Sequence, residues 1–354
     1  MMHIIKLYPY DNSLYHFGIA GLEETETIFH SDSLFSAIVN NYIKLFGEDD
    51  LEKFLNEAPV ISSMFHFIES DESKSVLFLP KPLAEIYFFE EEPEDKKKIK
   101  KISYISFNTL NLWNRGGRLS NAEMNRYIIN KKYLVCEEDL NRLGLESLRA
   151  VKEIEIVKRL KEIKVIVPRI QKENPLPYVE EHFYLNNNVI REKGKKIQLK
   201  TGFYFFVDNL KNDIIGKRFL QAVYLIKDEG LGGERSTGKG LFKRIVVKED
   251  VIKEDNINSD TYMSLSLVSP AEKETKSLLY FDILERKGYV YSIFKSKEYR
   301  KRPVWMLREG SVFNSKVKGE LKRVIDKEKD NFDHDVYKDG RALTIQIKVD
   351  KNEL

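Results

Sequence analysis

Apolar residues recur with regular periods in the N-terminal part of the chain, and these periods predict a strand followed by a helix. Residues 3–8 are predicted to form the strand, and residues 34–46 place their apolar side chains at helical spacing. Gly47 suits the position just after that helix, and Ser31 or Asp32 can cap its beginning. The same patterns predict a further helix and a further strand, at 50–57 and 76–79.

The middle of the chain is less regular. Charged residues crowd 90–101, which predicts a solvated loop or hinge. Two apolar segments, 165–170 and 182–185, flank a linker rich in proline and asparagine, and this order predicts a projecting hairpin in which Arg169 and Lys172 bracket the tip with charge. Helices are predicted at 138–143, 148–156 and 212–226, with a strong strand at 197–207.

A glycine-rich loop at 230–240 connects the helix at 212–226 with a predicted strand at 242–247. Two nucleotide-loop motifs do not fit it, because Gly240 stands where a Walker A loop needs Ser or Thr, and Arg235 stands at the third glycine of the dinucleotide fingerprint. A Walker A loop also runs from strand to helix, which is the reverse order. The loop is expected to carry backbone N–H groups and cations to a phosphate chain without a metal, and the alternative is a plain turn.

The order of predicted elements over the first 250 residues is β-α-β, an insertion, and β-α-β again. That order is typical of ferredoxin-like (RRM-like) folds and predicts an α+β domain at 1–255 with its insertion at about 90–195. The insertion shows little core-forming pattern of its own, and the second face of the ferredoxin-like sheet is expected to serve a partner or RNA. Residues 249–260 form a predicted linker.

The last hundred residues predict a second, smaller α+β domain at 256–354. Strands are expected at 262–268 and 343–349, and 278–284 is expected to pair with 289–294 around Gly288. The segment 286–308 carries eight Lys or Arg residues against one acid, with five interleaved aromatic residues. This composition predicts a surface for single-stranded RNA, and the alternative is an ordinary hairpin with basic solvent faces.

Composition narrows the class of protein. The 354-residue chain has a net charge of +3, so a surface for nucleic acid has to be local. Its one cysteine, Cys136, excludes an internal disulfide and a cysteine metal cluster and indicates a reducing compartment. With neither a signal peptide nor an apolar run long enough to span a membrane, a cytoplasmic protein without membrane contact is expected.

Catalytic and metal signatures are sparse. The six histidines show no zinc-ligand spacing, and neither a cofactor nor a metal is expected. His30 could act as a general base beside Asp32 as an acid, but capping or packing is the favoured interpretation of both. The expectation is therefore a protein that is not an enzyme.

The chain resembles the Cas-five-like RAMP subunit of type III-A (Csm) CRISPR effector complexes, the fourth Csm subunit. The residues that carry this resemblance span most of the chain in the family's order: 30–37, the loop 230–240, 264–270, 286–290, 306–313 and 334–337. The loop alone is typical of the whole RAMP superfamily, and the C-terminal segments are more specific.

The resemblance implies two ferredoxin-like domains, with a thumb-like hairpin in the insertion at 168–185 that kinks the guide. It implies a non-catalytic subunit that holds the 5′ tag of the crRNA and joins the large polymerase-like Csm subunit to a backbone RAMP Csm subunit. The residues expected to contact RNA are His30, Ser31, Asp32, Arg169, Lys172, Gly230, Gly232, Gly233, Arg235, Ser236, Thr237, Gly238, Lys239, Gly240, Lys243, Arg300, Arg302 and Arg308. The alternatives are a guide-processing RAMP endoribonuclease with His30 as its base and a general single-stranded RNA-binding module.

Overall fold

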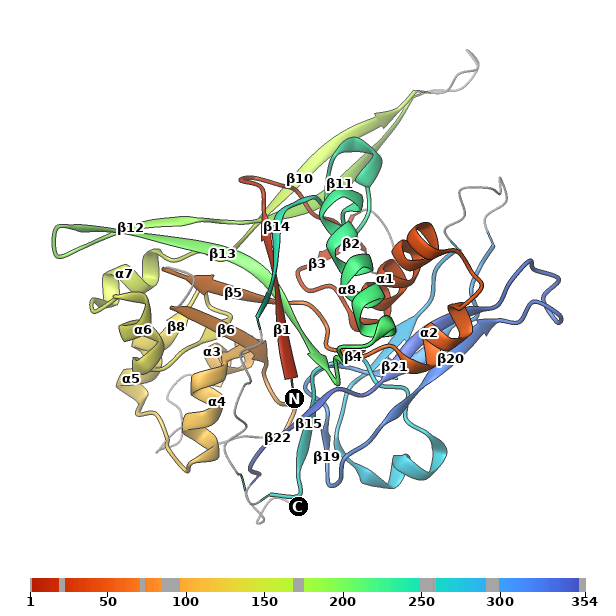
Figure 1. Ribbon diagram of the computed structural model, residues 1–354. Helices are drawn as coiled ribbons and strands as arrows, with labels where there is room; N and C mark the ends of the chain where they lie inside the picture. The colour runs from red at the N-terminus through yellow and green to blue at the C-terminus, as the bar shows by residue number, and fades with distance from the viewer. Residues whose placement is uncertain are drawn as a thin grey trace.

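The computed structural model describes residues 2–18, 23–70, 74–84, 96–167, 175–248, 257, 259–290 and 299–349. Helices and strands are mixed along the chain, which confirms the α+β class (Figure 1). The helices are α1 (Ser31–Phe46), α2 (Leu51–Glu57), α3 (Lys96–Lys101), α4 (Phe107–Asn114), α5 (Asn121–Tyr127), α6 (Glu137–Leu143), α7 (Leu148–Glu153) and α8 (Ile214–Glu229).

One large sheet runs through the molecule in the order β14-β1-β13-β5-β6-β7-β9-β8, and β4 and β12 also pair with β13. Strand β1, next to the edge strand β14, pairs antiparallel with both β13 and β14. The strands are β1 (Met2–Pro9), β4 (Val60–Ile61), β5 (Phe65–Glu69), β6 (Ser75–Pro80), β7 (Tyr104–Ser106), β8 (Ile128–Ile129), β9 (Tyr133–Leu134), β12 (Asn188–Glu192), β13 (Lys195–Asp208) and β14 (Phe242–Lys248).

Both faces of the central strands are buried. Successive residues of a strand point to opposite faces, and in β1 Ile5 and Leu7 pack under α1 and α8 while Ile4 and Tyr8 lie in a second core. That second core also contains side chains from 102–156 and from 263–349. The expectation that this face stays open for a partner is therefore wrong, as is the expectation that the insertion has little core of its own.

Two hairpins extend from the body in different directions (Figure 1). One is formed by β10 (Val157–Ile166) and β11 (Leu176–Leu185), and it confirms the predicted hairpin, although its strand pairing begins further back than predicted, at Val157. Its tip, with Arg169 and Lys172, lies outside the described residues. The other hairpin is formed by β12 and the first five residues of β13, 195–199.

The C-terminal part is built mainly of strands. A four-stranded sheet has the order β16-β19-β15-β22, made of β16 (Leu278–Tyr280), β19 (Val312–Phe313), β15 (Tyr262–Ser264) and β22 (Thr344–Gln346). Two two-stranded units of this part pair β17 (Ile283–Arg286) with β18 (Val304–Leu307) and β20 (Gly319–Ile325) with β21 (Val336–Arg341). In the N-terminal part, β2 (Phe17–Gly18) pairs with β3 (Thr25–Glu26). The described residues from 257 to 349 contain no α-helix, so a second ferredoxin-like unit is not confirmed.

The predicted strand pairing near Gly288 is wrong. The strand at 283–286 pairs with β18, which places Leu284 opposite Met306 and leaves Met306 1% exposed. Burial of the apolar face decided this register, since a strand keeps the pairing that puts its apolar side chains inside. The remainder of the predicted partner lies at 291–298, outside the described residues. The strands at 262–268 and 343–349 are confirmed only over Tyr262–Ser264 and Thr344–Gln346.

Local predictions succeeded where the pattern was strong. The helices at 34–46, 50–57, 138–143 and 212–226 are confirmed, and the helix at 148–156 is confirmed up to Glu153. Lys96–Lys101 forms α3, so a loop is wrong for that half of the charged run; residues 90–95 and most of the predicted linker lie outside the described residues. His30 occupies the N-cap of α1 without a side-chain capping bond, and Ser31 and Asp32 lie inside the first turn, so neither caps the helix.

Candidate functional site

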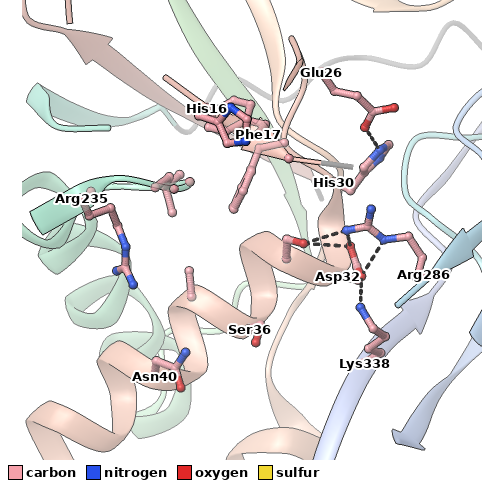
Figure 2. Close-up of a pocket in the computed structure, with 18 of the residues that line it drawn as sticks. His16, Phe17, Glu26, His30, Asp32, Ser36, Asn40, Arg235, Arg286 and Lys338 are labelled. Carbon is pink, nitrogen blue, oxygen red and sulfur yellow. Dashed lines mark hydrogen bonds and ion pairs between the residues drawn. The ribbon is translucent and has the colours of Figure 1, made fainter. Parts of the chain in front are cut away.

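A cavity of about 290 Å³ lies between one face of α1, the glycine-rich loop and the C-terminal strands (Figure 2). Asn41, one of the lining residues on α1, donates a hydrogen bond of 3.0 Å to the carbonyl of Ala222, which ties α1 to α8. We call this cavity the loop pocket. Its lining is His16, Phe17, Gly18, Glu26, Ile28, Phe29, His30, Asp32, Ser33, Ser36, Ala37, Asn40, Asn41, Lys44, Gly230, Leu231, Gly232, Gly233, Arg235, Arg286, Lys301, Tyr337 and Lys338.

The glycines of the loop allow close approach of backbone to backbone. A Cβ at Gly240, where φ is +77°, would come within 2.2 Å of the carbonyl oxygen of Leu231, and one at Gly232 would come within 2.5 Å of the carbonyl of His16. The N–H groups of Gly230, Gly233, Gly238 and Gly240 all donate to carbonyls of this chain. These four N–H groups are therefore engaged within the protein, so the expectation that the loop offers its N–H groups to phosphates is wrong for these four.

His30 lies between two carboxylates beside the pocket. Its Nδ1 is 2.7 Å from Oε1 of Glu309, and its Nε2 is hydrogen-bonded to Glu26. Burial alone would lower the pKa of His30, but the two carboxylates outweigh burial and raise the pKa to about 9. His30 is therefore an imidazolium at neutral pH with both ring nitrogens occupied. A general base needs a free nitrogen, so this arrangement does not suit that role.

The charge of His30 predicts a pH dependence of stability. Because its folded pKa of about 9 lies above the unfolded value of 6.5, the stabilisation is fully present below pH 6.5 and is lost as the pH rises toward 9. Between pH 6.5 and 8 we expect a loss of about 2 kcal/mol in the free energy of unfolding. Urea unfolding at several pH values measures this loss.

The matched control is His30→Gln, which should show a nearly flat profile in the same window. Measurements stop at pH 8 because burial lowers the pKa of Lys301 to about 8, and deprotonation of that lysine stabilises the fold at higher pH. Equal pH dependence in the parent chain and in His30→Gln would contradict the assignment.

Asp32 anchors two cations from the C-terminal part. Arg286 donates two hydrogen bonds to its carboxylate, of 2.9 and 3.0 Å, and Lys338 donates one of 2.8 Å (Figure 2). The side chain of Asp32 is fully buried. Burial alone would raise the pKa of Asp32, but Arg286 and Lys338 hold it well below its usual range. Asp32 is thus a fixed anion and unsuited to act as a catalytic acid.

The loop pocket is positively charged. Its cationic side chains, counting protonated His30, are His30, Lys44, Arg235, Arg286, Lys301 and Lys338, against the two carboxylates of Glu26 and Asp32. Two further carboxylates outside the lining, of Glu309 and Glu229, pair with His30 and Lys44, so the cations still outnumber the acids. Ser33, Ser36 and Asn40 follow α1 along the pocket and add hydrogen-bonding groups, and Arg235 reaches toward them from the loop (Figure 2). A cavity with this lining suits a chain of phosphates.

The structure brings some of the predicted contact residues together and separates others. His30, Asp32, Gly230, Gly232, Gly233 and Arg235 line the loop pocket, whereas Ser31 lies under it and accepts a hydrogen bond from the N–H of Leu267. Ser236, Thr237 and Gly238 lie on the exposed outer side of the loop, and Lys243 is exposed on β14. Arg300 is exposed, Arg302 pairs with Asp330, and Arg308 pairs with Glu26.

Lys239 does not point into the loop pocket. Its Nζ is 2.7 Å from Nε2 of His182 on β11 and 3.9 Å from carboxylate oxygens of both Glu162 and Glu180. Glu162, Glu180 and His182 lie close enough together to hold a metal ion, with ligand atoms within 4.8 Å of one another. Lys239 and Lys164 bring positive charge to these groups from the chain itself. Lys239 therefore ties the glycine-rich loop to the base of the β10–β11 hairpin.

Sequence reasoning missed several charged residues of this site, among them Glu26, Lys44, Glu309, Arg286, Lys301 and Lys338. Arg286 and Lys338 lie 254 and 306 positions from Asp32, so no local spacing links them. The only signal was their place in or near the basic C-terminal segments.

Among the helices that the structure describes, none is long and apolar enough to cross a membrane.

Comparison with known proteins gives consistent matches. Residues 257–347 match the family model described as the CRISPR Csm4 C-terminal domain. "CRISPR system Cms protein Csm4" of Methanocaldococcus jannaschii is 30% identical over 382 residues, covering 97% of both chains. The protein of the same name from Streptococcus thermophilus is 21% identical over 97% of this chain and 99% of that protein.

Two solved structures share the fold of this chain. The Csm4 fold in a Csm3-Csm4 subcomplex of the type III-A CRISPR-Cas interference complex has a TM-score of 0.69 and 26% identity, covering 97% of this chain and 98% of that one. A Csm1-Csm4 cassette in complex with pppApA has a TM-score of 0.58 at 18% identity, covering 99% of this chain and 100% of that one, and shows the fold alone.

The fold, the glycine-rich loop and these matches place the chain among the RAMP-type proteins of CRISPR systems. Within that class it belongs to the Csm4 family, because it is 30% identical to a Csm4 protein over nearly the whole length of both chains. The resemblance predicted from the sequence motifs is confirmed.

Proposed function

We propose that this chain is a non-catalytic RNA-binding subunit of a type III-A CRISPR effector complex. In this proposal it caps the 5′ tag end of the crRNA and joins the large polymerase-like subunit to a backbone RAMP subunit. The similar protein of known structure at 26% identity comes from a Csm3-Csm4 subcomplex, which supports the backbone partner. Family membership supports the large subunit as the other partner.

The observation that carries the RNA-binding role is the loop pocket. Six cationic residues and only two carboxylates line it, and Arg286 and Lys338 are held in place by the buried Asp32. Fixed cations beside hydroxyl and amide groups bind a phosphate backbone with little dependence on base sequence. That chemistry suits a protein that holds one end of an RNA, and it does not suit a protein that recognises a particular base sequence.

The proposal that the chain is not a nuclease is supported by the state of His30. Both ring nitrogens face carboxylates, and the neighbouring Asp32 is paired with Arg286 and Lys338. Incubating the purified chain with repeat RNA, with and without Mg²⁺ or Mn²⁺, tests whether the chain cleaves RNA. Cleavage that disappears in His30→Gln would favour the guide-processing endoribonuclease instead.

A finer description of the fold belongs to the proposal as well. The strand order β14-β1-β13-β5, with α1 and α8 on one face, supports a ferredoxin-like arrangement for the first part of the chain. Division at about residue 255 stays a prediction. The core that residues 263–349 share with 4–206 supports a C-terminal part that does not fold independently.

Arg235→Ala is expected to weaken RNA binding by removing a cation from the loop pocket. For a single-stranded RNA, the slope of log K against log salt should become less negative by about 0.7 for one lost phosphate contact. Fluorescence anisotropy with labelled repeat RNA at several salt concentrations measures both quantities.

Lys239→Ala is the matched control, because it removes a cation of the same loop that faces His182 instead of the pocket. We expect its salt slope to equal that of the parent chain. If Lys239→Ala flattens the slope and Arg235→Ala does not, the phosphates lie on the hairpin side of the loop and the assignment of the pocket is wrong.

Co-expression tests the place of the chain in a complex. We expect a stable complex with a backbone RAMP subunit, with the large subunit, or with both, and each interface should bury at least about 1,000 Å². The β10–β11 hairpin offers exposed apolar side chains for such contacts, since Ile163 and Val167 are 78% and 74% exposed. Size-exclusion chromatography with mass determination is the measurement. A monodisperse monomer that ignores both partners, with and without guide RNA, would favour the general RNA-binding module.

A further inference from the structure

A second basic cavity lies in the insertion, away from the loop pocket. Its volume is about 630 Å³, and it shares no lining residue with the loop pocket. It is formed by α3, the end of α5, the turn between β8 and β9, and the end of α7. In Figure 1 these elements lie together on one side of the molecule, while α1 and α8 lie on the other. We call it the lysine cavity.

Five lysines line this cavity: Lys97, Lys98, Lys101, Lys131 and Lys152. The two acids of the lining, Glu153 and Glu155, already pair with cations outside it. Glu153 accepts from Arg149 at 2.9 Å, and Glu155 lies 3.3 Å from Lys158. The lysines of the lining therefore outnumber its carboxylates by five to two.

The local structure keeps these cations close to one another. Lys97 and Lys101 are four residues apart on α3, where two like charges destabilise a helix by about 0.2–0.5 kcal/mol. Burial lowers the pKa of Lys152, and the charge of Lys98 lowers it further. Lys131 extends the cluster from a tight turn, where its φ is +58°. An anion in the cavity would relieve this mutual repulsion.

The remaining lining residues indicate which kind of anion fits. Ile128 and Ile154 are buried and give the cavity an apolar floor, and Asn125 and Asn130 add amide groups, of which that of Asn125 already bonds to Lys98 and to the carbonyl of Asn121. A nucleotide presents an apolar base face, polar base edges and a phosphate, which match the floor, the amides and the lysines in turn. Lysine binds phosphate as a point charge without demanding fixed geometry, so little sequence preference follows.

We propose that the lysine cavity binds the phosphate backbone of a single-stranded nucleic acid, at a site separate from the loop pocket. The proposal goes beyond the proposed crRNA-tag function and does not depend on it. An acidic protein surface is the competing occupant. RNA and single-stranded DNA share the chemistry that the cavity recognises.

The test uses the full chain with Lys101→Glu, Lys131→Glu and Lys152→Glu combined. Fluorescein-labelled oligouridylate and oligothymidylate of about 20 nucleotides are the RNA and DNA probes, and a labelled polyglutamate peptide stands for an acidic protein. For at least one nucleic acid, we expect binding to weaken more than about tenfold at low salt and the salt slope to become less negative by about 2, from three lost contacts.

The matched control combines Lys53→Glu, Lys217→Glu and Lys276→Glu, which change the net charge equally at exposed lysines that line neither cavity. Equal losses of nucleic-acid binding in the two triple variants, or no loss in either, overturn the proposal. The proposal is also overturned if the cavity variant loses binding of polyglutamate but binds both nucleic acids as the parent chain does. Arg235→Ala is measured in parallel. Weaker nucleic-acid binding in Arg235→Ala alone supports the loop pocket as the binding site and rejects the lysine cavity. Weaker binding in the cavity variant alone supports the lysine cavity and rejects the loop pocket.

A second measurement tests the proposal even if the triple variant does not fold. Lys131→Cys carrying a benzophenone photo-crosslinker leaves the other lysines in place and should crosslink the labelled RNA or DNA. The same label at Lys53→Cys is the control. Crosslinking that is equal at the two positions, or absent at Lys131→Cys, overturns the proposal.

Discussion

Asp32→Asn is expected to lower the free energy of unfolding by about 3–5 kcal/mol, because it leaves two buried cations without their anion. Arg286 and Lys338 both donate to this carboxylate, and its side chain has no exposed surface. Asparagine keeps the shape of the residue and removes only the charge. Urea unfolding followed by circular dichroism measures the loss.

The control for Asp32→Asn is Asp50→Asn, which breaks the exposed pair between Asp50 and Arg218 at 2.8 Å. Exposed pairs contribute about 0–1 kcal/mol, so this variant should stay close to the parent chain. Adding Lys338→Met to Asp32→Asn should recover part of the lost stability, because one of the two unpaired cations is then gone. Losses of similar size for Asp32→Asn and Asp50→Asn would show that the buried cluster does not hold α1 to the C-terminal strands.

Gly240→Ala is expected to cost about 2–5 kcal/mol and to disrupt the loop pocket, because the new Cβ would clash with backbone and strain φ together. At Gly240 the Cβ would lie 2.2 Å from the carbonyl oxygen of Leu231, and φ is +77°. The hydrogen bond from the N–H of Leu231 to the carbonyl of Gly240 closes the loop at this point. Thermal unfolding and RNA binding are the two measurements.

Gly238→Ala separates the two causes of that loss. Its φ is +84°, yet nothing lies within 4 Å of the position of a Cβ, so only the strain of about 1–2 kcal/mol applies. Gly233 is a further contrast, since it has no positive φ and the nearest atom to a Cβ there would be in the ring of His16, at 3.2 Å, with the carbonyl oxygen of His16 at 3.8 Å. If Gly238→Ala destabilises the chain as much as Gly240→Ala, close approach of the backbone is not what the loop requires.

The parts of the fold that could be predicted are those whose signal is local. Apolar spacing predicts the helix at 34–46, and Gly47 predicts its end, where φ is 76°. The loop between α8 and β14 follows from its five glycines. The end of α8 and the beginning of β14 needed no knowledge of distant residues, because each is determined by the period of its own segment.

The parts that could not be predicted depend on distant neighbours. Nothing near β17 in the sequence indicates that its partner is β18, because burial of Met306 and Leu307 selects the pairing. The role of Lys239 was missed for the same reason: its position in the loop suggested phosphate contact, but the hairpin places His182 beside it. The chemistry of a side chain can be read from the sequence, but its neighbours cannot.

The sequence by itself determined the family, the α+β class, the main helices and the glycine-rich loop. These depend on motifs and periods that lie within short segments. Only the tertiary structure decided what Asp32 and His30 do, since their charged partners Arg286, Lys338 and Glu309 come from the far end of the chain. The physical reason is that burial makes an unpaired charge costly, so the fold pairs charged groups across any sequence distance.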